Sequence, residues 1–279
     1  MRFEKWQALG NDYIVIEATA LPWELTPRRI AAICAAHFGV GSDGILLLVE
    51  AEEERHVARL RIFNPDGSEA ELSGNGAREA VLYLRRSGWV DRDEFAIITA
   101  AGEIRPVITG PGEVRMELGS ARLASADFPS GGRDGRGTVH SNGREWGFQH
   151  VNVGNPQCVI EVGDELESLD LEAIGPQIER SELFPNRTNV SFIRVDAARV
   201  RARIFERGVG VSLSSGTGAS GAAVAAHLRG APSPVTVELD GGELTVEVGA
   251  ALELTLIGSA EPVFTAELSD EFIARLTAL

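Results

Sequence analysis

Two short stretches of the chain combine a serine with closely spaced glycines. Residues 73–77 read Ser-Gly-Asn-Gly-Ala, and residues 215–219 read Ser-Gly-Thr-Gly-Ala. Each pattern predicts a helix start, where unpaired backbone N–H groups carry about half a positive charge and glycine lets a ligand approach the backbone. Such a site stabilises the extra negative charge that a carboxylate gains when the adjacent carbon loses its proton. The two stretches therefore predict proton removal beside a carboxylate.

The two stretches belong to a longer internal repeat. Residues 9–17 resemble residues 153–161, and residues 59–64 resemble residues 201–206, in the same order and at offsets of 142 to 144 residues. A nearly constant offset over three matches indicates a duplication. We expect Ser73 and Ser215 to flank one carbon from opposite sides, which is the arrangement for removing a proton on one face and returning it on the other.

The repeat predicts two domains in a chain of 279 residues, a length that suits two domains. Residues 1–138 would form the first and residues 139–265 the second, with the glycine-rich stretch 130–137 just before the boundary. Residues 266–279 are an amphipathic run left over from the repeat. We expect this run to pack back onto the first domain.

The elements that would position the serines are mostly strands. Runs rich in β-branched residues, bounded by Gly, Pro or Asp, predict strands at 13–16, 95–99, 114–118, 235–239 and 244–248, with a hairpin turn at 240–242. Helices are predicted at 27–38, with Thr26 as N-cap, and at 76–86 and 218–228. The latter two carry several alanines and suit close packing inside a sheet. The predicted fold is α/β (α+β), with each domain a β-barrel-like sheet around a central helix.

Composition excludes several classes of protein. The 41 acidic and 26 basic side chains give a net charge of −15, which disfavours nucleic acid and anionic membranes as partners. No apolar run is long enough to span a bilayer and no signal peptide is evident, so a cytoplasmic location is expected. Cys34 and Cys158 lack metal-ligand spacing and are predicted to be buried, so no metal is expected.

Taken together, the motifs resemble the diaminopimelate epimerase family. The resemblance rests on residues 64–78, 154–156, 186–190, 206–210 and 215–218, and it extends over nearly the whole chain. It implies an amino-acid epimerase that needs no cofactor and converts LL- to meso-diaminopimelate in lysine and cell-wall biosynthesis. It also implies two pseudo-symmetric domains with the site in the cleft between them, and a homodimer is common in the family.

The resemblance also implies which residues meet the substrate. The backbone N–H groups of residues 74, 75, 216 and 217 would hold the carboxylate at the reacting centre. Arg207 can form a two-pronged contact with a second carboxylate, and Glu206 can pair with an ammonium group. The full set of implied binding residues is Asn11, Asn64, Gly74, Asn75, Asn155, Asn189, Glu206, Arg207, Gly216 and Thr217.

The chain departs from the family at the catalytic positions. The family's two bases are cysteines, whereas serines stand here at Ser73 and Ser215. A free thiol has a pKa of about 8.5, but an alkoxide is inaccessible near neutral pH without an adjacent base. The family's usual histidine after Gly-Asn-Pro is Gln157, and its Glu-Thr pair is Val211 and Ser212. The carboxylate that the motif places best as an alternative base is Glu206.

Three interpretations of the sequence remain open. The chain is an epimerase that uses another base, or a paralogue that binds a diaminopimelate-like amino acid without turnover. A third interpretation is a dinucleotide-binding protein, because residues 216–221 satisfy Gly-x-Gly-x-x-Gly and Asp240 follows a predicted strand. The glycine stretch does not directly follow a strand, which weakens this third interpretation.

Overall fold

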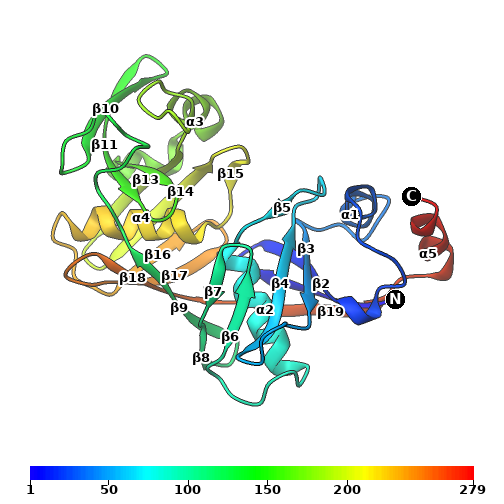
Figure 1. The fold of residues 1–279 in the computed structure, drawn as a ribbon. Helices are drawn as coiled ribbons and strands as arrows, with labels where there is room; N and C mark the ends of the chain where they lie inside the picture. The colour runs from blue at the N-terminus through cyan, green and yellow to red at the C-terminus, as the bar shows by residue number, and fades with distance from the viewer. The chain divides into compact units, whose positions relative to one another are not determined.

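A computed structural model describes residues 1–279, which divide into two compact units (Figure 1). Unit 1 comprises Met1–Met116 and Gly258–Leu279, and unit 2 comprises Glu117–Ile257. The division falls after residue 116, whereas the repeat predicts a boundary after residue 138. The division lies within strands β9 (Glu113–Ser120) and β18 (Glu253–Ser259).

Unit 1 is a sheet that curves around one helix, α2 (Gly74–Arg86), drawn in cyan in Figure 1. The helix packs against the first four strands and the last one. Neighbouring strands of this sheet are antiparallel except at two places, where β2 (Asn11–Glu17) is parallel to β3 (Ile45–Val49) and β4 (His56–Phe63) is parallel to β6 (Ala96–Thr99). The order is β19 (Glu261–Glu267), β1 (Arg2–Ala8), β2 (Asn11–Glu17), β3 (Ile45–Val49), β4 (His56–Phe63), β6 (Ala96–Thr99) and β7 (Gly102–Ile104), with β5 (Glu69–Ala70) beside β4.

Two helices, α1 (Pro27–Cys34) and α5 (Asp270–Thr277), contribute to an apolar core in unit 1. The hydroxyl of Thr26 accepts a hydrogen bond from the Arg29 backbone N–H at 3.3 Å, which confirms the predicted N-cap. The helix ends at Cys34 rather than at residue 38, because Ala35 is extended. Gly39 then lies against the backbone of residues 32 and 33, where a Cβ would approach the Ala32 carbonyl oxygen to 2.2 Å.

Unit 2 repeats this plan around α4 (Gly216–His227), drawn in yellow in Figure 1. β12 is parallel to β13, and β14 is parallel to β16. The strand order within the unit is β10 (Arg136–Ser141), β11 (Arg144–Asn152), β12 (Pro156–Glu161), β13 (Asn189–Asp196), β14 (Arg199–Glu206), β16 (Val235–Leu239) and β17 (Gly242–Val248), with β15 (Gly210–Ser212) beside β14. The path continues through β18 and β9 to β8 (Val107–Gly110).

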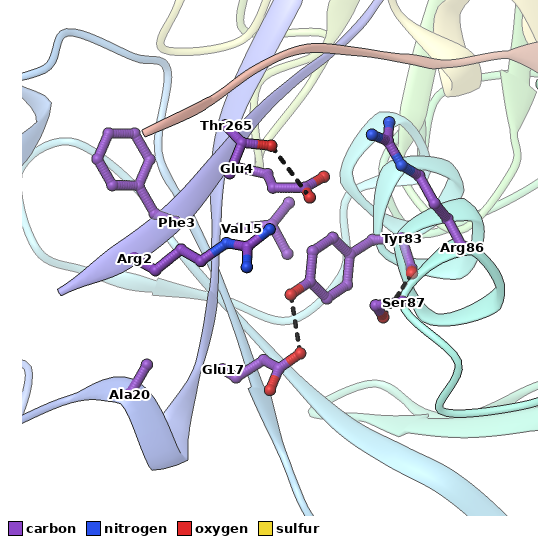
Figure 2. A pocket seen from close by; sticks show the side chains of 10 residues that line it. All are labelled: Arg2, Phe3, Glu4, Val15, Glu17, Ala20, Tyr83, Arg86, Ser87 and Thr265. Atoms are coloured by element: carbon purple, nitrogen blue, oxygen red, sulfur yellow. Dashed lines mark hydrogen bonds between the residues drawn. The ribbon is translucent and has the colours of Figure 1, made fainter. Parts of the chain in front are cut away.

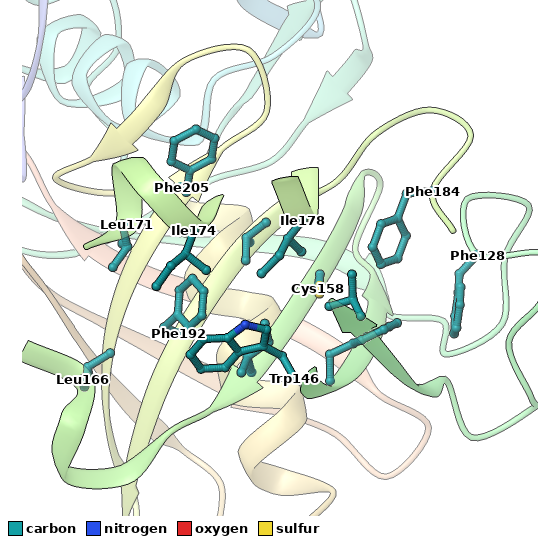
Figure 3. Close-up of a cluster of buried hydrophobic side chains, with 14 residues drawn as sticks. Phe128, Trp146, Cys158, Leu166, Leu171, Ile174, Ile178, Phe184, Phe192 and Phe205 are labelled. Carbon is teal, nitrogen blue, oxygen red and sulfur yellow. The ribbon is translucent and has the colours of Figure 1, made fainter. Parts of the chain in front are cut away.

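Helix α3 (Leu171–Glu179) packs against β10, β13 and β14 and shares an aromatic-rich core with them (Figure 3). Trp146 and Phe192 meet edge to face at 5.5 Å within that core, and Cys158 is fully buried in it. Cys34 is also buried, so both cysteines lie in the cores as predicted. Short 3-10 helices lie at η1 (Ala18–Ala20) and η2 (Gly163–Ser168).

The sequence repeat is thus a repeat of topology. Strands β2, β3, β4, β6 and β7 have the same order and the same parallel pairs as β12, β13, β14, β16 and β17. In both units the central helix follows the short strand that pairs with β4 or with β14. The α/β prediction is confirmed, although both sheets are open rather than closed barrels. None of the helices is long and apolar enough to cross a membrane.

Candidate active site

The first serine site is the start of α2. Ser73 is the N-cap, and its Oγ accepts a hydrogen bond from the Gly76 backbone N–H at 3.1 Å. Gly74 and Asn75 follow in the first turn of the helix. A Cβ on Gly76 would lie 2.9 Å from Leu46 Cδ2, so glycine lets β3 pack closely against the helix start.

A tyrosine on the neighbouring strand β2 completes the contacts of Ser73. The buried Tyr13 hydroxyl donates to Ser73 Oγ across 3.3 Å. Sequence reasoning missed this residue, because its aromatic ring in an apolar run looks like core. No local sequence signal indicates where the hydroxyl of such a residue points.

Asn11 and Asn75, both predicted to bind substrate, meet in unit 1. Asn75 Nδ2 donates to Asn11 Oδ1 at 3.2 Å, and Asn11 Nδ2 donates to Asp43 at 2.8 Å. Arg78 Nη2 donates to Asn75 Oδ1 at 2.6 Å, which fixes the orientation of the Asn75 amide. Asn64 lies in the turn after β4, where its amide donates to the Ser68 hydroxyl.

Two buried ionisable groups lie on α2 behind this network. Arg78 is fully buried, and burial lowers its pKa to about 10 even though Glu79 favours its charged form. Burial raises the pKa of Glu79 well above its usual range, a rise that Arg78 only partly opposes. Neither carboxyl oxygen of Glu79 has a hydrogen-bond partner. The first serine site is therefore supported by a buried cation beside a carboxyl group that favours its neutral form.

The second serine site is the start of α4. Ser215 is the N-cap, and its Oγ accepts from the Gly218 backbone N–H at 3.2 Å, as in the first site. The Ser215 hydroxyl donates in turn to Glu206 Oε2 at 3.0 Å. A Cβ on Gly218 would lie 2.6 Å from Ile204 Cδ1, so here β14 approaches the helix closely.

Asn155 and Gln157 lie at this helix start. Asn155 Nδ2 donates to Thr217 Oγ1 at 3.2 Å, and Gln157 Nε2 donates to Asn155 Oδ1 at 2.6 Å. Gln157 is fully buried, and its other amide atom, Oε1, has no partner. Asn155 is therefore held by its two neighbours at the first turn of α4.

Arg207 is held by its backbone rather than by an ion pair. Its N–H donates to Asn189 Oδ1 at 2.8 Å, and its exposed guanidinium donates to the Asn186 carbonyl oxygen at 2.8 Å. Glu179 at the end of α3, which sequence reasoning missed, accepts from the Gly208 N–H at 2.9 Å and pairs with Arg187 at 3.0 Å. These contacts fix the loop that follows Glu206.

The glycine pattern at 216–221 does not form a loop. All six residues lie inside α4, and the Ser220 hydroxyl donates back to the Gly216 carbonyl oxygen. Asp240 accepts a hydrogen bond from Arg201. A dinucleotide fingerprint needs glycines in the turn between a strand and a helix and an acidic residue available to the ribose. This geometry does not favour the dinucleotide interpretation.

A separate cavity of about 420 Å³ lies at the far end of α2 from Ser73 (Figure 2). Tyr83 donates to Glu17 Oε1 there at 2.8 Å, and Trp89, which does not line the cavity, donates to the same oxygen at 2.9 Å. Burial and the Glu17 carboxylate raise the pKa of the Tyr83 phenol. None of the residues that line this cavity belongs to either serine site.

The fold is shared with solved racemases and epimerases. A probable proline racemase from Agrobacterium radiobacter, with bound carbonate, superposes with a TM-score of 0.70 at 17% identity, over 96% of this chain and 93% of that one. A hydroxyproline epimerase from Agrobacterium vitis, with bound trans-4-hydroxy-L-proline, gives a TM-score of 0.66 at 18% identity, over 95% and 91%. The fold is therefore one that amino-acid racemases and epimerases use.

Sequence comparison identifies the family. The model of the family described as diaminopimelate epimerase matches residues 3–124 and 149–262. "Diaminopimelate epimerase 2" of Nostoc sp. is 40% identical over 100% of this chain and 99% of its own length, and the diaminopimelate epimerase of Azoarcus sp. is 38% identical over 96% and 98%. The chain belongs to the diaminopimelate epimerase family, and it is an isomerase of the epimerase class.

Proposed function

We propose that this chain interconverts LL- and meso-diaminopimelate, and that the reaction feeds lysine and cell-wall biosynthesis. Support comes from relatives of that name that match its full length at close to 40% identity. The observation that best supports an active enzyme is the hydrogen bond that the Ser215 hydroxyl donates to Glu206 Oε2 at 3.0 Å. It supplies a carboxylate base where the family resemblance implies a thiol.

A serine hydroxyl cannot act as the base alone. Stabilisation at a helix start is worth about 1 kcal/mol, or roughly one pK unit, which is far too little to form an alkoxide near neutral pH. A hydroxyl becomes useful when an adjacent group takes its proton. In this proposal Glu206 takes that proton, so the Ser215 hydroxyl acts as a relay between substrate and carboxylate.

The other predicted residues receive binding roles. The N–H groups of residues 74, 75, 216 and 217 would hold the carboxylate whose adjacent carbon loses its proton. Arg207, with an exposed guanidinium, would hold the distant carboxylate. The side-chain amides, which both donate and accept, would select the configuration of the non-reacting centre; they belong to Asn11, Asn64, Asn155 and Asn189. In this proposal a homodimer is the expected assembly.

Hydrogen exchange in deuterium oxide tests the proposal. The native chain is incubated with LL- or meso-diaminopimelate, and both α-deuteration and the change of isomer are followed. We expect slow exchange and slow epimerisation. The variant that carries Ser73→Cys with Ser215→Cys restores the thiols that the resemblance implies, so we expect it to react faster.

Calorimetry separates turnover from binding. Heat of binding without exchange would make the chain a binding paralogue, and no heat with either isomer would remove diaminopimelate as its ligand. Arg207→Gln is the matched variant, because it removes the charge and the two-pronged contact while keeping similar length. We expect it to weaken binding of both isomers.

A further inference from the structure

One carboxylate in unit 2 contacts both loops that carry candidate binding residues. Asp127 Oδ1 accepts from the Asn186 side-chain amide at 3.0 Å, and Asp127 Oδ2 accepts from the Asn152 side-chain amide at 2.7 Å. Asn186 lies in the loop between α3 and β13, which leads to Asn189. Asn152 ends β11, shortly before Asn155. Asp127 therefore joins two segments that are far apart in the chain.

The first of these contacts leads to Arg207. The Asn186 carbonyl oxygen accepts from the exposed Arg207 guanidinium at 2.8 Å, so the position of Asn186 determines where that guanidinium lies. The next residue, Arg187, has a φ of 62°, a conformation that is uncommon for residues other than glycine. Side-chain contacts hold this turn on both sides, from Asp127 to Asn186 and from Glu179 to Arg187 at 3.0 Å.

The second contact leads to Asn155. A carboxylate can only accept hydrogen bonds, so Asp127 binds the NH₂ end of the buried Asn152 amide and leaves its oxygen free to accept elsewhere. That oxygen accepts from the Gly154 backbone N–H at 3.1 Å. The Val153 N–H donates to the Asn155 carbonyl oxygen at 3.2 Å and closes the same turn. Asp127 thus orients the amide that holds the turn before Asn155.

Asp127 is itself fixed to the core of unit 2. Ser125 Oγ accepts from the Asp127 backbone N–H at 3.2 Å and lies 3.0 Å from Nε2 of the fully buried His150. The next residue, Phe128, is buried in the aromatic-rich core, where its ring lies 5.7 Å from that of Phe184 (Figure 3). The carboxylate is therefore presented from a well-packed segment to two loops at the surface.

We propose that Asp127 is a positioning residue for substrate binding, which acts on Arg207 through Asn186 and on Asn155 through Asn152. The inference rests on the binding roles proposed above for Arg207 and Asn155. A carboxylate suits this place because its two oxygens accept from two amides at once and orient both. A side-chain amide at the same place would present a donor to one of them.

Calorimetry with Asp127→Asn tests this role, because the change keeps the size of the side chain and removes one accepting oxygen. We expect the dissociation constant of both diaminopimelate isomers to rise about fivefold, which corresponds to the loss of one hydrogen bond. The rate at saturating substrate should stay within about twofold, because the lost contacts would hold non-reacting parts of the substrate.

Asp134→Asn is the matched control. Asp134 is an exposed carboxylate in the same glycine-rich region, and its side chain accepts from the Arg136 backbone N–H rather than from either binding loop. We expect this control to bind both isomers as the native chain does. Equal dissociation constants for Asp127→Asn and the native chain would overturn the proposal.

A double-mutant cycle with Arg207→Gln separates positioning from a general loss of structure. If Asp127 acts through Arg207, its removal matters less once the guanidinium is absent. The rise in the dissociation constant of the double variant should then fall short of the product of the two single rises by about twofold or more. A merely structural role would weaken binding independently of Arg207, so rises that multiply would overturn the proposal.

Amide hydrogen exchange tests the two contacts without any ligand. In Asp127→Asn we expect the backbone amides of residues 152–155 and 186–189 to exchange about threefold faster or more, because both loops lose their common anchor. Strands β16 and β17, which Asp127 does not contact, should keep their native exchange rates. Unchanged exchange in both loops, or faster exchange throughout unit 2, would overturn the proposal.

The outcomes distinguish this inference from the proposed function. Binding by the native chain that is unchanged in Asp127→Asn would overturn the positioning role and leave the epimerase function standing. Absence of both binding and α-hydrogen exchange with either isomer would overturn the epimerase function. In that case the amide exchange of residues 152–155 and 186–189 still decides whether Asp127 holds the two loops.

Discussion

The two central helices, α2 and α4, occupy the same place in the two units but have different interiors. Each begins at a serine N-cap followed by Gly-x-Gly-Ala. Positions 78 and 79 of α2 are a buried arginine and glutamate, whereas the corresponding positions of α4, offset by 142 residues, are Ser220 and Gly221. The rest of α4 is mostly alanine, and Gly218 to Ala226 are all buried.

The difference shows two ways of fixing the same kind of helix start. In α2 the Arg78 guanidinium donates to Asn75 Oδ1 and to the Gly74 carbonyl oxygen, so a buried cation holds the first turn. In α4 the absence of side chains brings Ile204 and Gln157 against the helix backbone. Both helix starts pack closely against a strand, at Gly76 and at Gly218. Unit 1 adds charge-assisted hydrogen bonds from Arg78, and unit 2 adds a close approach of Gln157 to Gly221. The comparison predicts that different substitutions should damage each site.

The largest expected effect is on activity, from Glu206→Gln in unit 2. An amide cannot take a proton from Ser215, so we expect epimerisation to slow by about 10³-fold, within the usual range for loss of a general base. Initial rates with LL-diaminopimelate measure it. Glu69→Gln, an exposed carboxylate paired with Arg61, is the control and should keep its rate. A loss of less than tenfold for Glu206→Gln would assign the base elsewhere.

The next largest effect is on stability, from Arg78→Met in unit 1. The change would leave Asn75 Oδ1 and the carbonyl oxygens of Gly74 and Ser259 without their donor. Removing a buried charge from its hydrogen-bonded partners costs about 3 kcal/mol. Urea unfolding measures the loss, and Ser220→Ala at the equivalent position of α4 should cost less than about 1 kcal/mol. Similar losses in the two variants would mean that Arg78 does not hold the first turn.

Much of the fold could be predicted from the sequence, because its signals are local. Thr26 as N-cap and Pro27 after it predicted the start of α1. Asp240 and the two glycines after it predicted the hairpin turn between β16 and β17. The two central helices begin only two residues before their predicted starts. The end of α1 was predicted too late, since the contact of Gly39 with the backbone of residues 32 and 33 is a tertiary feature.

The site was harder to predict, because its extra members act over long separations. Tyr13 and Ser73 are 60 residues apart, and nothing in an apolar strand run says where a phenol hydroxyl points. Glu179 contacts the Gly208 N–H across 29 residues. The resemblance named Glu206, but its contact with Ser215 depends on how β14 and α4 pack. Motifs therefore indicated candidate residues, and packing determines the hydrogen-bond partners of each.

A smaller effect is expected from Gly221→Ala, which fills the close approach that distinguishes α4. The new Cβ would lie 2.9 Å from both Cβ and Cγ of buried Gln157, and neither atom is the free end of a side chain. Overpacking of this kind costs about 1–3 kcal/mol. Gly74→Ala is the matched change in α2, where no atom lies within 4 Å of the new Cβ, and it should not destabilise the protein. Thermal unfolding compares the two, and equal losses would contradict the packing account of α4.

The smallest effect at neutral pH, and the only gain, is expected from Glu79→Gln. Burial raises the pKa of the Glu79 carboxyl above its value in the unfolded chain. Folding therefore favours the protonated form of Glu79. Its contribution to the free energy of unfolding is complete below the unfolded pKa of about 4.3 and is lost as the pH rises through the folded pKa. An amide is neutral at every pH, so the variant escapes that loss. We expect the free energies of unfolding to agree within about 1 kcal/mol at low pH, and the variant to become relatively more stable as the pH is raised.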